Sequence, residues 1–102
     1  MSLYSVEFGL QALEEAERLP FRLRARLKDN LEFLRAGPFR SHPGVRVKEL
    51  RDLRGVWRFH LDGRYRVFYF TIESRLVIVM VYKSAGITRL TLAELKRRLR
   101  SR

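Results

Sequence analysis

The chain has no cysteine and only two histidines among its 102 residues. Without thiols, neither a disulfide framework nor a thiolate metal site can form. Two imidazoles are too few for the usual zinc sites, which take three or four protein ligands. We therefore expect neither a bound metal nor a cofactor, and no small-molecule ligand.

Long hydrophobic runs are also missing. The longest, Leu76 to Tyr82, is too short to span a bilayer. The first ten residues lack the basic and apolar regions of a signal peptide. We expect a cytoplasmic protein without a membrane partner. A hydrophobic content of 46% argues against disorder and suffices for one core, so residues 1–102 should form a single domain.

Acidic residues are scarce as well. Eleven acids face twenty-two bases, which gives a net charge of +11 and a pI of about 11.2. Most of the bases are arginines, whose planar guanidinium binds phosphate through two hydrogen bonds. This balance predicts a polyanionic partner: RNA, DNA or an acidic protein segment. The alternative is a charge-rich solvated surface, but a thermophile-like surface should add glutamate as well.

Hydrophobic periodicity and turn residues predict an α+β domain of order β-α-α-β-β-β-β-α. An antiparallel sheet of four to five strands should carry an N-terminal helical hairpin on one face and leave its other face partly open. Thr91 and Glu94 fit a capping box that would open the last helix. The expected strands are 4–8, 47–50, 56–61, 65–72 and 76–83, and the expected helices are 10–19, 21–36 and 91–100.

The hairpin between the third and fourth strands decides which side chains share the open face. A two-residue loop would bury Arg66 opposite Phe59 among aromatic rings, and burying an unpaired arginine costs several kcal/mol. A three-residue loop, 62–64, instead pairs Leu61 with Tyr65 and His60 with Arg66.

The next turn is expected to be a two-residue one at 73–74, which would set Arg66 opposite Val81 and point Tyr82 to the core. Strand alternation then gathers four side chains at one end of the open face, where they would form an anion site. The alternative is an ordinary solvated sheet face. The four side chains are Arg58, His60, Arg66 and Lys83.

Three strand segments carry a resemblance to a known family. Val47–Leu50, Gly55–Leu61 and Gly63–Phe70 resemble the central strands of the RelE/ParE toxins, above all their RelE-like and HigB-like branches. The stretch Ala12–Pro20 is similar too, so the likeness covers nearly the whole chain. It implies a toxin of a type II toxin–antitoxin module, neutralised by an acidic, RelB-like antitoxin. RelE-like members cut mRNA in the ribosomal A site, whereas ParE-like members act on DNA gyrase.

The resemblance also implies roles for particular residues. Arg66 is expected at the scissile phosphate, with Arg58 and Lys83 adding positive charge. His60 is the candidate acid or base. Many active members carry a Tyr or His near the C-terminus, and residues 84–102 contain neither. Contacts to the remaining RNA are expected from Lys48, Arg51, Arg54, Arg64 and Arg89.

Three functions stay open at this point. The first is a ribosome-dependent, metal-independent endoribonuclease, for which the ribosome and mRNA are partners. The second is a gyrase inhibitor of the ParE kind without nuclease activity. The third is an RNA-binding module that is not toxic.

Overall fold

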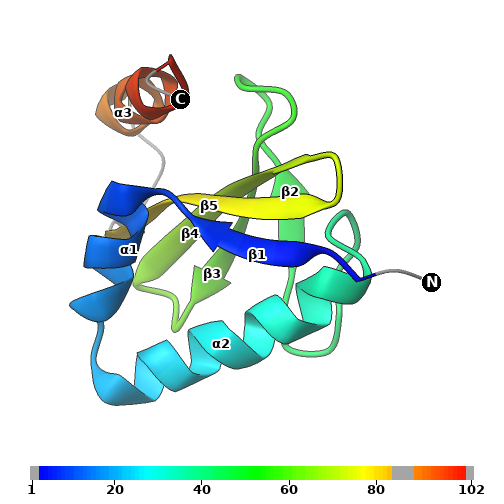
Figure 1. The fold of residues 1–102 in the computed structure, drawn as a ribbon. Coiled ribbons are helices and arrows are strands. Elements are labelled where there is room, and N and C mark those ends of the chain that lie inside the picture. Colours follow the sequence, from blue (N-terminus) through cyan, green and yellow to red (C-terminus); the bar gives the residue numbers. More distant parts are fainter. Residues whose placement is uncertain (1–2, 84–88, 101–102) are drawn as a thin grey trace.

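The computed structural model describes residues 3–83 and 89–100 and has the expected α+β architecture (Figure 1). Five strands and three helices follow each other in the expected order. Their bounds are β1 Ser5–Phe8, α1 Leu10–Glu17, α2 Phe21–Ala36, β2 Val47–Glu49, β3 Trp57–Leu61, β4 Tyr65–Ile72, β5 Arg75–Lys83 and α3 Arg89–Arg100.

The strands form one mixed sheet in the order β1-β5-β4-β3-β2. The strands β2 to β5 are joined by short connections and pair antiparallel, as expected. By contrast, β1 is separated from them by both N-terminal helices, and it adds to the outer edge of β5 in the parallel direction. The sheet is therefore not wholly antiparallel, because a strand reached through a helical crossover is free to run parallel to its neighbour.

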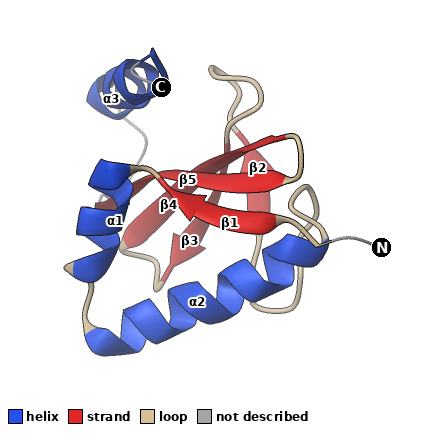
Figure 2. Cartoon of the chain, viewed as in Figure 1, coloured by secondary structure: helices blue, strands red, loops and turns tan. Residues whose placement is uncertain are grey.

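The helices α1 and α2 cover one face of the sheet and bury its larger core (Figure 2). Pro20 and Gly37 flank α2, where a proline can begin a helix and a glycine can end one. The helix α1 packs on β5, and α2 packs on β1 and β3. The apolar stripe of α2 is fully buried, as its spacing predicts; it consists of Leu23, Leu27, Leu31 and Leu34.

The opposite face of the sheet carries α3 and a smaller core. Leu95 of α3 is completely buried there, next to Phe68, Met80 and Val56. The predicted capping box is wrong: α3 already begins at Arg89, so Thr91 lies inside its first turn. Within the described residues, no helix combines the length and apolarity needed to cross a bilayer.

The hairpin between β3 and β4 has the predicted register. Leu61 pairs with Tyr65 and His60 pairs with Arg66 across a three-residue turn. Asp62 and Gly63 both adopt positive φ angles, 61° and 67°, which aspartate tolerates better than most residues and glycine adopts freely. Burial of the aromatic face thus decides the register, as the cost of a buried arginine requires.

The register between β4 and β5 departs from the prediction halfway along the pair. The turn at 73–74 pairs Ile72 with Arg75, as expected. However, Tyr69 pairs with Ile78 and Phe68 pairs with Met80, so Val79 is an extra residue on β5.

Such a bulge reverses which face the following residues occupy. Arg66 therefore lies opposite Tyr82 and not opposite Val81, and Lys83 lies opposite Tyr65. The predictions that Lys83 shares a face with Arg66 and that Tyr82 points to the core are both wrong. The cause is the single inserted residue.

An ion pair from the two flanking helices holds the bulged part of β5. The edge strand β1 ends opposite Ile78, so no strand covers the β5 edge beyond it. Glu15 of α1 accepts a hydrogen bond from the Val81 N–H at 3.0 Å. Arg98 of α3 donates to the Val79 carbonyl at 2.9 Å. The two side chains also pair with each other at 2.9 and 2.7 Å. They replace the missing strand partner at the bulge.

We expect Glu15→Gln to lower the free energy of unfolding by about 1–3 kcal/mol, because it removes the charge from a hydrogen-bonded pair whose arginine side chain is only 10% exposed. Glu14→Gln is the matched control: Glu14 is exposed and in contact with solvent. Urea denaturation of the three proteins measures the difference. Equal stabilities would show that the Glu15–Arg98 pair does not hold the bulge.

Candidate active site and nucleic-acid interface

Three cationic or imidazole side chains share the face of the sheet that carries α3. Arg58 and His60 alternate on β3 and therefore point to the same side. Arg66 of β4 is the direct cross-strand partner of His60. Directly opposed residues on antiparallel strands lie with their side chains together. The structure thus brings together three of the four residues predicted for the anion site.

Arg58 and His60 form a direct hydrogen bond. The Arg58 Nη1 atom lies 2.8 Å from the His60 Nε2 atom. A guanidinium can only donate, so Nε2 must be the acceptor nitrogen of a neutral ring. Burial of the ring and, next to it, the charges of Arg66 and Arg58 lower the pKa of His60 below its ordinary value of 6.5. The imidazole is therefore neutral at physiological pH.

Arg58 itself sits in an environment that disfavours its charge. Burial, followed by the Arg66 guanidinium, lowers the pKa of Arg58 from its ordinary value. None of the ion pairs among the described residues joins Arg58 to a carboxylate. Two neighbouring guanidiniums under these conditions form a site that an anion would stabilise.

Tyr82 completes the cluster on the third strand. It pairs with Arg66 across β4 and β5, and its ring packs against the smaller core. A phenol hydroxyl can donate or accept a proton. The sequence pattern could not place Tyr82 here, since simple alternation along β5 points it to the opposite face. Lys83, which alternation placed in the cluster, leaves it for the same reason.

A hollow of about 420 Å³ adjoins the cluster, between the β2–β3 connection and α3. Arg58 belongs to the cluster and also lines the hollow. Of the residues expected to contact RNA, Arg54 and Arg64 are exposed and lie outside the lining. The hollow is lined by Lys48, Glu49, Leu50, Arg51, Asp52, Arg58, Arg89 and Leu92.

Sequence reasoning missed the acids and leucines of this hollow. Arg89 and Leu92 belong to α3, whereas the remaining lining residues lie between 48 and 58. No spacing rule connects these two segments, because α3 reaches this face through tertiary contacts, namely the packing of its leucines on the sheet and the bonds of Arg98. The face that the sequence predicts to be partly open is therefore partly covered by α3.

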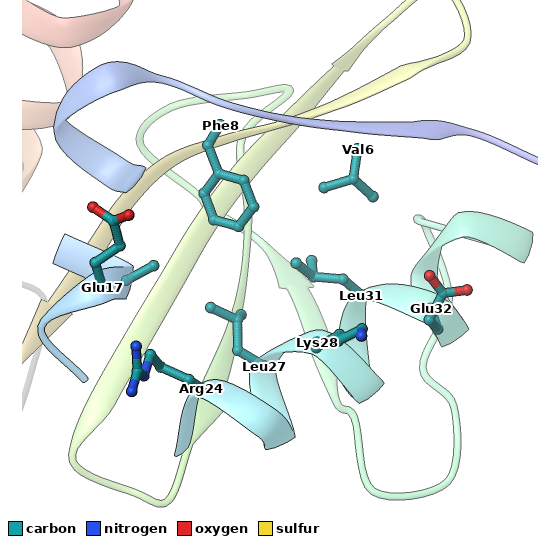
Figure 3. Close-up of a pocket in the computed structure, with 9 residues that line it drawn as sticks. Val6, Phe8, Glu17, Arg24, Leu27, Lys28, Leu31 and Glu32 are labelled. Atoms are coloured by element: carbon teal, nitrogen blue, oxygen red, sulfur yellow. The ribbon is translucent and has the colours of Figure 1, made fainter. Parts of the chain in front are cut away.

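A second hollow, of about 300 Å³, lies on the other side of the sheet between β1 and α2 (Figure 3). Val6 and Phe8 face Leu27 and Leu31 across it (Figure 3). Apolar side chains form much of its wall, and the charged side chains that line it are two acidic and two basic ones. It therefore lacks the convergent cations of the first site; the charged residues are Glu17, Arg24, Lys28 and Glu32.

The other histidine does not join either site. His42 lies in the loop after α2, where its Nε2 atom is 2.9 Å from the Gly37 carbonyl and its ring stacks on Phe33. These contacts give it a structural role in the loop. Among the described residues, no group of three or more His, Asp or Glu side chains is arranged to hold a metal ion.

The cluster contains the groups that acid–base chemistry around an anion would require. Two guanidiniums supply positive charge, a neutral imidazole supplies a proton acceptor, and a phenol supplies a proton donor. These are the groups that a phosphodiester would meet on this face, and they come from three adjacent strands.

Comparisons with known proteins agree with this fold. Residues 6–86 match the family model described as the ParE toxin of type II toxin-antitoxin systems, parDE. No curated protein matches the chain. A free mutant form of the E. coli toxin RelE is similar in structure, with a TM-score of 0.74 at 23% identity over 95% of this chain and 98% of that chain.

Two further solved structures are similar at comparable identity. The YoeB/ParE toxin from Agrobacterium tumefaciens has a TM-score of 0.69 at 19% identity, covering 78% of this chain and 98% of that one. A chain of the archaeal RelE–RelB complex from Pyrococcus horikoshii has a TM-score of 0.68 at 22% identity, covering 84% and 99%. The family model spans most of the chain, and the protein therefore belongs to the RelE/ParE toxins of type II toxin–antitoxin systems.

Proposed function

We propose that this toxin is a ribosome-dependent endoribonuclease that cuts mRNA in the ribosomal A site without a metal ion. The observation that carries the proposal is the placement of Arg58, His60, Arg66 and Tyr82 on one face of three adjacent strands. Cleavage that leaves a 2′,3′-cyclic phosphate needs a base, an acid and charge stabilisation, and this face supplies candidates for all three.

The reaction begins with attack of the ribose 2′-oxygen on the neighbouring phosphorus. His60 accepts the 2′-hydroxyl proton at Nε2. Arg66 and Arg58 stabilise the extra negative charge on the phosphorane, which is commonly the largest contribution to such catalysis. The bond from phosphorus to the 5′-oxygen then breaks, Tyr82 donates its proton to that oxygen, and a 2′,3′-cyclic phosphate remains.

The Arg58–His60 hydrogen bond couples this base to its substrate. In the resting protein, Arg58 occupies the very nitrogen that must accept the proton. A phosphate attracts Arg58 more strongly than a neutral imidazole does, because it carries a negative charge and can accept two parallel hydrogen bonds from the guanidinium. Arrival of the phosphate would thus free Nε2 for the 2′-hydroxyl.

The resting partner in this proposal is an acidic, RelB-like antitoxin. Its support is the positive charge of this face and the similarity to a toxin chain solved in a RelE–RelB complex. An acidic amphipathic helix would neutralise the cations and cover the apolar surface around them.

A second candidate function is inhibition of DNA gyrase without nuclease activity. The observation that favours it is the match to the ParE family model over residues 6–86. Mapping mRNA 5′ ends on ribosomes after induction separates the two functions. New ends within A-site codons support the nuclease, whereas DNA damage induction without new ends supports gyrase.

We expect Arg66→Ala to slow mRNA cleavage at least ~100-fold, because the guanidinium stabilises charge that develops in the transition state. Lys83→Ala should change the rate little, since the β5 bulge places Lys83 on the other face. Cleavage of a programmed ribosome complex measures both. A fully active Arg66→Ala toxin, or equal losses in both variants, would contradict the assignment.

We expect Tyr82→Phe to slow cleavage ~100-fold or more, because it removes the proton donor for the leaving oxygen while keeping the ring in the smaller core. Tyr65→Phe is the matched control: Tyr65 is also half-buried but packs against the larger core on the opposite face. The two variants should have similar thermal stability. Wild-type cleavage by Tyr82→Phe would remove the phenol from the mechanism.

The pH profile tests His60 as the base. The rate should fall as the pH drops through the pKa of His60, and because this pKa lies below 6.5 the wild type should remain active at that pH. Arg58→Met removes one neighbouring cation, so the pKa should rise and the acidic limb should move to higher pH. Arg22→Met, on the exposed side of α2, should leave the limb in place. An unmoved limb in Arg58→Met would rule out the coupling.

A further inference from the structure

The hollow beside the cationic cluster has charges of both signs, unlike the cluster itself. Four cations and two carboxylates line it, together with Leu50 and Leu92. A site for phosphate alone would gain nothing from carboxylates in its wall, because they repel the ligand. The lining therefore indicates a ligand that carries hydrogen-bond donors as well as acceptors.

The two carboxylates of the hollow are not equivalent. The Glu49 Oε2 atom accepts the backbone N–H of Gly55 at 2.8 Å and helps to close the β2–β3 connection. Asp52 is exposed, and among the described residues no side chain or backbone group bonds to its carboxylate. Its two oxygens are available to a ligand, although four cationic residues line the same hollow.

We propose that this hollow is a nucleobase subsite that selects guanine next to the cleaved phosphate, with Asp52 as the residue that reads the base. Guanine presents two parallel donors, N1–H and the N2 amino group, which match the two oxygens of one carboxylate. Its opposite edge presents the O6 and N7 acceptors, which arginine or lysine binds. No other common base combines these two edges.

The remaining lining residues suit the rest of such a nucleotide. Leu50 and Leu92 supply apolar contact for the faces of the base. Arg89, at the start of α3, and Lys48 supply positive charge for O6, N7 or a flanking phosphate. A hollow of about 420 Å³ lies within the range of pockets that bind molecules of this size.

The position of the hollow links this base to the reaction. Arg58 lines the hollow and also bonds to His60 in the cluster. A guanine in the hollow would therefore place an adjoining phosphate beside Arg58. This inference rests on the proposed nuclease function for its biological meaning, but binding of the base is measurable without cleavage.

The test titrates the full-length toxin with guanosine 5′-monophosphate and with inosine 5′-monophosphate, which lacks only the N2 amino group. Chemical-shift changes in the backbone amides measure affinity and location. We expect guanosine monophosphate to bind at least about fivefold more tightly, and to shift the amides of Asp52 and Leu92. Equal affinities, shifts elsewhere, or full competition by inorganic phosphate would overturn the proposal.

The matched variants are Asp52→Asn and Asp62→Asn. Both keep the shape of an exposed aspartate in a loop, but Asp62 lies in the β3–β4 turn outside the hollow. Asp52→Asn should bring the ratio of the two affinities close to one, because its amide cannot accept both donors. Asp62→Asn should keep the wild-type ratio. A ratio that survives Asp52→Asn would exclude Asp52 as the reader.

Cleavage mapping separates this inference from the proposed function. If the nucleotide preference holds but no mRNA is cut, the nuclease function fails and the subsite stands. If mRNA is cut without any guanine preference at the neighbouring position, and Asp52→Asn leaves the cleavage pattern unchanged, the subsite fails and the nuclease stands.

Discussion

The site depends on one ion pair that holds a bulge in β5. Glu15 and Arg98 form an ion pair. Glu15 also accepts a hydrogen bond from the Val81 N–H, and Arg98 donates one to the Val79 carbonyl, where no neighbouring strand does so. The extra residue at Val79 moves each later side chain of β5 to the face opposite the one that simple alternation predicts. As a result, Tyr82 lies beside Arg66, and Lys83 lies on the other side. A contact between two helices thus decides which side chain completes a cluster on the sheet.

The two faces of the sheet differ in the side chains that they bury. The face under α1 and α2 buries most of the large apolar side chains and supplies the stability of a small domain. The face under α3 combines a smaller apolar core with partly buried guanidiniums, whose desolvation is unfavourable. An anionic ligand would offset that cost, so the same feature that reduces stability on this face favours binding of an anion.

Much of the fold was predictable because local signals agree with each other. The leucine spacing predicts α2, because it repeats over a few turns of one helix. The three-residue turn at 62–64 and the cost of burying Arg66 predict the register of β3 and β4, because both depend on residues close in sequence. The pairing of His60 with Arg66 followed from these. The capping box at Thr91 failed, because the packing of Leu95 on the sheet sets where α3 lies, and Glu94 binds Arg98 at 2.8 Å.

The sequence by itself determined the strong positive charge, the order of the elements, and the shared face of Arg58, His60 and Arg66. Each of these follows from composition or from an alternation over a few residues. Only the tertiary structure decided the bulge, the position of Tyr82 and the hollow beside Arg58. Those features arise from groups far apart along the chain, such as Glu15 and Val81, whose meeting depends on how the helices pack on the sheet.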